Sequence, residues 1–236
     1  MNNTARNRMK ANSALAAIAI LAGALTYQAP AASATEAPQA PTAQEYLAYL
    51  DGQNDPEADS IATQFKALSA INQQQFLGYL VDPEVLKATV GETGGTESDP
   101  VARRTLKGGD VVVQTETVAS RSLARGTAAD WWCSSTFYST VFGIKITKFK
   151  LEQWYHSTTT KVDKIYNVSA SKYNYNPGVV LGHQPEEQWI SAAGNALAYV
   201  TWEGELTISG LSVSLDKRHH VRCDETGFRA HSLYNL

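Results

Sequence analysis

Apolar residues recur with the period of a helix between residues 42 and 90. Ile61, Phe65 and Leu68, for example, lie three or four positions apart and therefore share one helical face. Each of the segments with this period begins at a residue type that commonly caps a helix: Thr42, Asp55, Ser69 and Asp82. Thr42 with Glu45 fits a capping box, and proline follows both Asp55 and Asp82 at the first helical position. We therefore predict a small region of four short helices.

One sequence pattern occurs twice in this region. Residues 46–50 and 76–80 both read aromatic, Leu, small, Tyr, Leu, and an Asp-Pro-Glu triplet follows each copy. The pattern indicates either a duplicated helical hairpin or two similar amphipathic helices that both need a start signal. Two copies are too few for a solenoid, which needs three or more. A unit of this size buries little apolar area alone, so it either packs on the rest of the chain or serves as a prosegment or spacer.

From Trp132 onward the period changes from 3.6 to 2, which is typical of strands with one buried face. Phe149, Leu151 and Gln153 share one side of a strand, while Ile144 and Ile146 are out of phase with them. We expect a bulge or turn near Thr147 at the slip. The pattern predicts six to eight strands with little helix between them. An antiparallel β-sandwich is the expected packing, and a small barrel is the alternative.

These patterns divide the chain into four parts. Residues 1–34 form a signal peptide, 35–90 an acidic helical region, 91–130 a linker with one strand, and 131–236 a β-sandwich domain. The linker assignment depends on a Gly- and Thr-rich composition from Gly91 to Gly109, and its strand is Val111–Val118. The basic pair Arg103-Arg104 offers a protease an exposed site there, so we expect the helical region to be separable from the sandwich.

Charge and composition differ between the two halves. Residues 35–130 hold fourteen acidic and seven basic side chains, whereas residues 131–236 hold nine acidic and ten basic side chains. All five tryptophans and all five histidines lie in the second half. The formal charge of −3 for the whole chain is too small to favour nucleic acid as a partner.

The N-terminus has the layout of a secretory signal. Arg6, Arg8 and Lys10 precede an apolar stretch of twelve residues from Ala14 to Leu25. Ala32-Ser33-Ala34 then fits a signal-peptidase site, so we expect cleavage after Ala34. Twelve apolar residues are too few to span a bilayer, which takes about 20, and we expect no membrane insertion. The alanine-rich signal is typical of a bacterial exported protein that is released outside the cell.

Export favours pairing of the two cysteines. In an oxidising compartment two cysteines are more often joined than free, and Cys133 and Cys223 allow one intramolecular disulfide. The bond would close a loop of about 90 residues and stabilise the fold by up to ~4 kcal/mol in the chain-entropy model.

No motif for catalysis or for cofactor binding occurs in the chain. It has no Gly-x-Ser-x-Gly elbow, no phosphate loop and no His-x-His or His-Glu-x-x-His spacing, so we expect neither a metal nor a cofactor. Adjacent His219 and His220 point to opposite faces of a strand. A secreted hydrolase that uses a histidine or the pair Glu203 and Glu205 is the alternative function. His183 with Glu186 and Glu187 is the other cluster of ionisable groups.

Aromatic side chains are the stronger indication of function. A body of about 100 residues contains more aromatic side chains than one core needs. Those expected at exposed positions are Trp154, Tyr173, Tyr175 and Trp189. Exposed aromatic rings can stack on sugars or anchor a protein, so we expect a secreted binding module with an extracellular carbohydrate or protein ligand. A further alternative is a proprotein whose C-terminal β domain is the active species.

Overall fold

The computed structural model describes residues 39–89, 93–96, 102–121, 128–208 and 211–236, and at 93–96, 206–208 and 211–215 it describes the backbone alone. Residues 35–236 form one compact unit. The predicted signal peptide lies outside the described residues. The expectation of export is therefore still a prediction.

Four helices begin where their capping residues predict. They are α1 (Ala43–Asp51), α2 (Pro56–Ala67), α3 (Ala70–Leu80) and α4 (Pro83–Thr89). The capping box of α1 is formed, because the Thr42 side chain accepts a hydrogen bond from the Glu45 amide while the Glu45 carboxylate accepts one from the Thr42 amide. Asp55 and Ser69 cap α2 and α3, and Asp82 accepts the Glu84 amide at 2.8 Å.

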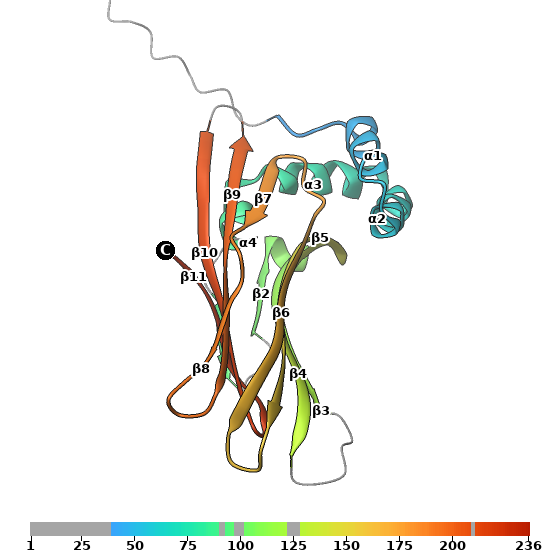
Figure 1. Cartoon of the computed structure of the whole chain (residues 1–236). Coiled ribbons are helices and arrows are strands. Elements are labelled where there is room, and N and C mark those ends of the chain that lie inside the picture. The colour runs from blue at the N-terminus through green and yellow to red at the C-terminus, as the bar shows by residue number, and fades with distance from the viewer. Residues whose placement is uncertain (1–38, 90–92, 97–101, 122–127, 209–210) are drawn as a thin grey trace, which may run out of the picture. The chain divides into compact units, whose positions relative to one another are not determined.

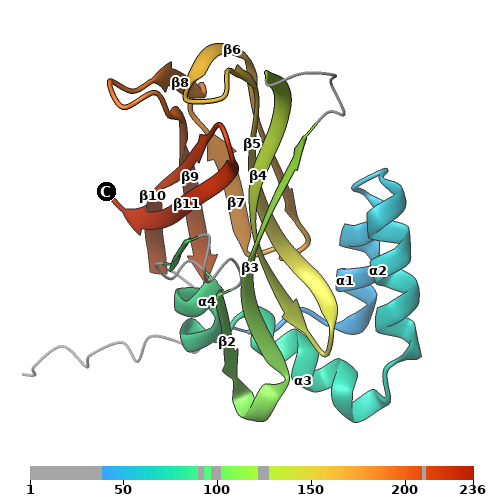
Figure 2. The same ribbon diagram turned by 90° about the horizontal axis from the view of Figure 1, so that it is seen from below.

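Two antiparallel sheets follow the helices, as predicted (Figures 1 and 2). Sheet A has the order β1-β11-β10-β9-β7, with β8 also paired to β9, and sheet B has the order β2-β3-β4-β5-β6. The strands are β1 (Thr93–Thr96), β2 (Ala102–Leu106), β3 (Val111–Arg121), β4 (Ala129–Val141), β5 (Ile144–Ser157), β6 (Val162–Asn174), β7 (Val179–His183), β8 (Glu187–Ile190), β9 (Ala196–Ile208), β10 (Leu211–Asp224) and β11 (Gly227–Asn235). A short 3-10 helix, Lys107–Gly109, joins β2 to β3.

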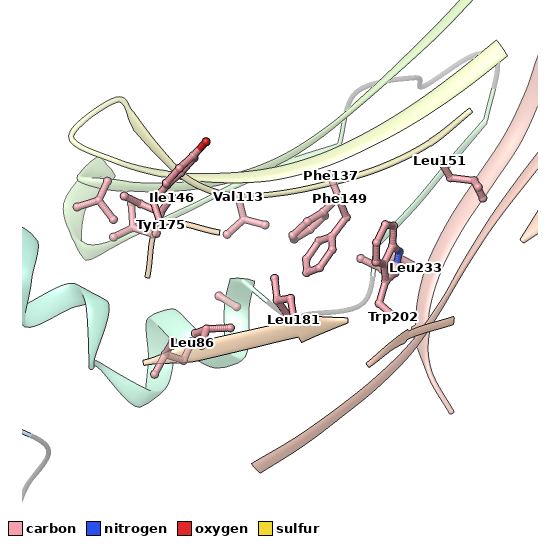
Figure 3. Packing of buried hydrophobic residues seen from close by; sticks show 14 of the residues in the cluster. Leu86, Val113, Phe137, Ile146, Phe149, Leu151, Tyr175, Leu181, Trp202 and Leu233 are labelled. Carbon is pink, nitrogen blue, oxygen red and sulfur yellow. The ribbon is translucent and has the colours of Figure 1, made fainter. Parts of the chain in front are cut away.

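The inner faces of the two sheets pack on one another to form a β-sandwich. Phe149 of sheet B and Trp202 of sheet A point toward each other between the sheets, with ring centroids 5.1 Å apart (Figure 3). Both side chains are at most 1% exposed. Along β5 the buried residues alternate with partly exposed ones, as the period of two predicts. The register shifts between Ser139 and Thr140, opposite Ile146, which confirms the predicted slip beside Thr147.

The stretch 91–130 contributes more than the single strand predicted there. Thr93–Thr96 pairs with β11 and Ala102–Leu106 pairs with β3, so β1 and β2 extend both sheets. Residues 103–105 of β2 are exposed, because this strand lies at the edge of sheet B. Because most of its residues are polar, β2 lacks the alternation of apolar and polar residues that identifies strands elsewhere in the chain.

The helices cover one end of the sandwich (Figure 1). A small apolar cavity of about 20 Å³ lies where Leu86 of α4 meets residues of both sheets, including Val111 and Leu181. Tyr49 and Tyr79, which occupy the same position of the repeated sequence pattern, both reach the β structure. The Tyr49 hydroxyl donates to the Asn174 carbonyl at 3.2 Å, and the Tyr79 hydroxyl donates to Asp110 at 3.0 Å. Buried residues of helices and strands thus belong to one hydrophobic cluster.

The predicted disulfide joins the two sheets. Cys133 of β4 is bonded to Cys223 of β10, and both residues are fully buried. Cys133 lies toward the end of β4 that is far from the helices, four residues after the strand begins. The sandwich is therefore covered by helices at one end and crosslinked near the other.

Candidate functional site

An open groove lies along the outer edges of β6 and β7, beside the helices. Its volume is about 430 Å³, within the range of about 300–1,000 Å³ that is typical of small-molecule sites. Helix α1 and the cap of α2 border one side, and the end of β6, the turn after it and β7 border the other. The residues that line this groove, the β6–β7 groove, are Tyr49, Gln53, Asp55, Lys172, Tyr173, Asn174, Tyr175, Pro177, Val179, Val180 and Leu181.

The turn after β6 is fixed by side-chain amides. Asn174 Nδ2 donates to the carbonyls of Asn176 and Val179, at 2.9 and 2.6 Å. Asn176 Oδ1 accepts the Gly178 amide at 3.0 Å, and Asn176 Nδ2 donates to the Leu80 carbonyl of α3 at 2.8 Å. These bonds confirm the turn predicted at Asn176-Pro177-Gly178. They hold one wall of the groove in place against the helices.

Tyr173 and Tyr175 lie side by side on this wall. They are two positions apart in extended chain, so their side chains leave the same face. Their ring centroids are 6.5 Å apart with an interplanar angle of 18°. Tyr175 is 3% exposed and its hydroxyl donates to Asp55 Oδ2 at 2.9 Å, whereas Tyr173 is 38% exposed. The Lys148 ammonium lies 4.9 Å from the Tyr173 ring centroid, in a cation–π contact.

The polar groups of the groove combine one carboxylate, one amine and two amides. Burial and the hydrogen bond to Asp55 raise the pKa of Tyr175 well above its ordinary value, so Tyr175 remains a hydrogen-bond donor at neutral pH. Burial lowers the pKa of Lys172. Gln53 and Asn174 supply the amides. Hydrogen-bonding groups thus stand beside an exposed aromatic ring.

The other two predicted binding residues lie elsewhere. Trp154 is on the outer face of sheet B, half-buried and directly opposite Trp132 in the strand register. Trp189 is on β8 of sheet A, 40% exposed, with its ring 5.4 Å from that of Tyr199. The structure therefore brings Tyr173 and Tyr175 together but places neither tryptophan in the groove.

The groups considered for hydrolysis do not converge on the groove either. Glu203 and Glu205 share the outer face of β9, where both are exposed, and Gln184 donates to Glu203 at 2.7 Å. Near His183, the Glu186 carboxylate accepts the backbone amide of Ala170 at 2.8 Å. Among the described residues, no three His, Cys, Asp or Glu side chains come together in a way that could hold a metal ion.

Two histidines lie inside the sandwich. His219 is 0% exposed, with Nε2 at 3.0 Å from Ser135 Oγ, while its neighbour His220 is half-buried on the opposite face, as the strand period predicts. Burial lowers the pKa of His219 to about 3 and that of His231 to about 4. Both side chains are therefore neutral at physiological pH and belong to the core rather than to a surface site.

The periodicity and motifs of the sequence do not reveal the wall of the groove that the helices supply. Tyr49, Gln53 and Asp55 are in a region predicted to be separable, and Asp55 was identified only as a helix cap. Lys172 was not singled out because a lone lysine in a strand carries no motif. The repeated pattern was the one available signal, since it marks Tyr49 and Tyr79 as equivalent side chains.

The fold and the groove together define a single-disulfide antiparallel β-sandwich that carries a helical cap and a tyrosine-lined groove. No described helix has the length and apolar character needed to cross a membrane. Comparison of the chain with protein-family models, with curated proteins and with solved structures gives no match.

Proposed function

We propose that this protein is an exported saccharide-binding protein and that the β6–β7 groove is its binding site. The observation that carries the proposal is the exposed ring of Tyr173 beside Tyr175 in a groove that also holds hydrogen-bonding groups. A sugar presents C–H groups on its ring faces and hydroxyls at its edge. An aromatic ring with amide and carboxylate neighbours matches both kinds of surface.

Preorganisation supports this assignment. Asp55 caps α2 and also accepts the Tyr175 hydroxyl, so one carboxylate fixes both walls of the groove. The turn after β6 is held by the amides of Asn174 and Asn176. A wall that is already ordered loses little conformational entropy when a ligand binds.

The helical region is part of the proposed site. Tyr49, Gln53 and Asp55 form one wall, so the function requires this region to stay attached. This geometry favours the intact chain over a proprotein whose β domain acts alone. The exposed positions of Glu203 and Glu205 favour binding over hydrolysis.

The test compares two tyrosines on the same strand. Tyr173 and Tyr166 both lie on β6, are 38% and 47% exposed, and have a lysine ammonium 4.9 and 5.0 Å from the ring centroid. Only Tyr173 lines the groove. Binding of the chain from residue 35 onward to an array of neutral and acidic glycans should be lost in Tyr173→Ala and retained in Tyr166→Ala.

Other outcomes identify the alternatives. Release of reducing sugars that depends on Glu203 would establish the hydrolase instead. Equal loss of binding in both tyrosine variants would place the site on the open face of sheet B. If no glycan binds, the saccharide proposal is wrong and a protein ligand becomes the better hypothesis. N-terminal sequencing of secreted protein should find Thr35 first, and an intact Met1 would refute export.

A further inference from the structure

Aromatic side chains on the sandwich surface repeatedly join a carboxylate to a basic group. The Tyr138 hydroxyl donates to Glu116 at 2.6 Å, and the Lys145 ammonium lies 5.6 Å from the centroid of the same ring. Three further aromatic residues make the same pair of contacts. These acid–aromatic–base triplets are Glu116–Tyr138–Lys145, Glu152–Trp132–Lys150, Asp130–Tyr166–Lys164 and Glu187–Tyr199–Arg218.

Each triplet carries little net charge, and its acid, aromatic ring and base interact with one another. The aromatic O–H or N–H donates to the carboxylate, and the ring face attracts the cation. In the triplet of Trp132 the acid and base also pair directly, because Lys150 Nζ lies 2.6 Å from Glu152 Oε2. Such a surface leaves little net charge with which to attract a ligand. Trp131 differs, since it lies under Arg121 and donates to the hydroxyl of Ser157.

Tyr173 has the base of a triplet but not the acid. Lys148 covers its ring at 4.9 Å, yet within the described residues its hydroxyl donates to no carboxylate and Lys148 forms no ion pair. The next residue along the groove wall, Lys172, is likewise without a carboxylate partner in the described part of the chain. Lys148 thus lies over the one exposed tyrosine ring of the groove, and Lys172 lines the same groove from the opposite face of β6.

We propose that the ligand supplies the missing acid, so that the groove selects saccharides with carboxylate groups, as in polymers of uronic acids. The carboxylate would accept hydrogen bonds from Lys148 or Lys172 and from the Tyr173 hydroxyl, while the sugar ring contacts Tyr173. Asp55 is the one carboxylate among the residues that line the groove and it keeps its negative charge, but its two oxygens already accept hydrogen bonds from the Tyr175 hydroxyl and the Glu57 amide, and the two lysines outnumber it. This inference rests on the proposed saccharide-binding function.

The experiment compares one polymer backbone with and without its charge. Calorimetry should show that oligogalacturonate binds at least tenfold more tightly than the same oligomer after full methyl esterification. Oligomers of hyaluronan and alginate extend the test to other uronates. Lys148→Met and Lys172→Met should each weaken uronate binding about fivefold, as expected for a partly exposed charge pair. Lys164→Met is the matched control from a complete triplet and should change affinity less than twofold.

The outcomes separate this inference from the function on which it rests. If neutral glycans bind through Tyr173 and are preferred, or if the ester binds as well as the acid, the groove is a saccharide site but the selection for carboxylate is wrong. Binding of sulfated but not carboxylated glycans, or of no uronate at all, also overturns the inference. If no glycan of any kind binds, both proposals fail together. Uronate binding should weaken as salt is raised, because the pairs are near the surface.

Discussion

The two ends of the sandwich are closed by different means. At one end α3 and α4 cover the gap between the sheets, and Tyr49, Tyr79 and Asn176 join helices to strands through hydrogen bonds. Toward the other end no helix is present in the described residues, and the Cys133–Cys223 disulfide joins the sheets instead. Packing of helices therefore joins the two sheets at one end, and a covalent bond joins them near the other.

The difference extends to the interior near each end. Beside the helices the core is largely aliphatic, with Leu86, Val111 and Leu181 around a cavity of about 20 Å³. Toward the disulfide the inner faces contain Gln153 and His231. Gln153 Oε1 and both ring nitrogens of His231 are buried, with no hydrogen-bond partner among the described residues. Unpartnered buried polar atoms are costly, so the crosslink offsets part of the cost of this interior.

The largest test removes the helical end. Deleting residues 35–90 exposes the aliphatic residues of both sheets that α3 and α4 cover, and we expect the remaining strands not to fold cooperatively. Near-ultraviolet circular dichroism and thermal unfolding measure this. A chain that lacks only residues 35–38 is the control, because it keeps Ala40, which packs against the core, and it should melt like the longer one.

The sequence predicts the opposite result, a separable helical region. A deleted chain that unfolds cooperatively at a similar temperature would support that prediction, and would show that the helices only rest on the sandwich. Trypsin cleavage at Arg103 or Arg104 in exposed β2, followed by intact-mass measurement, gives an independent answer.

The second test opens the other end. Cys133→Ser with Cys223→Ser should lower the free energy of unfolding by up to ~4 kcal/mol, because the unfolded chain loses a crosslink that spans 90 residues. Urea unfolding measures the change, and thiol labelling of denatured wild-type protein should find no free cysteine. An unchanged midpoint would mean that packing alone closes this end.

The third test measures how the free energy of unfolding depends on pH, which reports on the histidines buried between the sheets. In the folded state burial lowers the pKa of His219 to about 3 and that of His231 to about 4, below the ordinary value of about 6.5. The unfolded chain therefore binds more protons between these values. The stability that comes from keeping these two histidines neutral is fully present above about pH 6.5. It is lost as the pH falls, by about 2 kcal/mol per histidine at pH 5, until the folded protein is also protonated, near pH 4 at His231 and near pH 3 at His219.

Replacing His231 with Gln should remove about one proton from this pH dependence, measured as the slope of unfolding free energy against pH. A slope that is equal in wild type and His231→Gln would show that this histidine does not titrate on unfolding.

Local rules predicted the elements well because their causes are local. Thr42, Asp55 and Ser69 cap helices through bonds within three residues, and the alternation along β5 follows from one buried face. The groove depends instead on residues 120 positions apart, as Asp55 and Tyr175 are. Their pairing follows from how helices and sheets pack, which periodicity does not specify. The short polar strands β1 and β2 were missed for a related reason, since each depends on a distant partner.

The smallest and sharpest test compares one tyrosine hydroxyl at each end. The Tyr175 hydroxyl donates to Asp55 at 2.9 Å on the helical side, and the Tyr155 hydroxyl donates to the Asp224 carbonyl at 2.7 Å on the disulfide side. Phenylalanine keeps each ring and removes only the donor. We expect Tyr175→Phe to lower the free energy of unfolding by about 2 kcal/mol, because the Tyr175 hydroxyl donates to a charged carboxylate. Tyr155→Phe should lower it by about 1 kcal/mol, because the acceptor is a neutral carbonyl. If the helices contribute little to the stability of the sandwich, Tyr155→Phe should have the larger effect. Loss of the bond to Asp55 would then leave the unfolding of the strands unchanged.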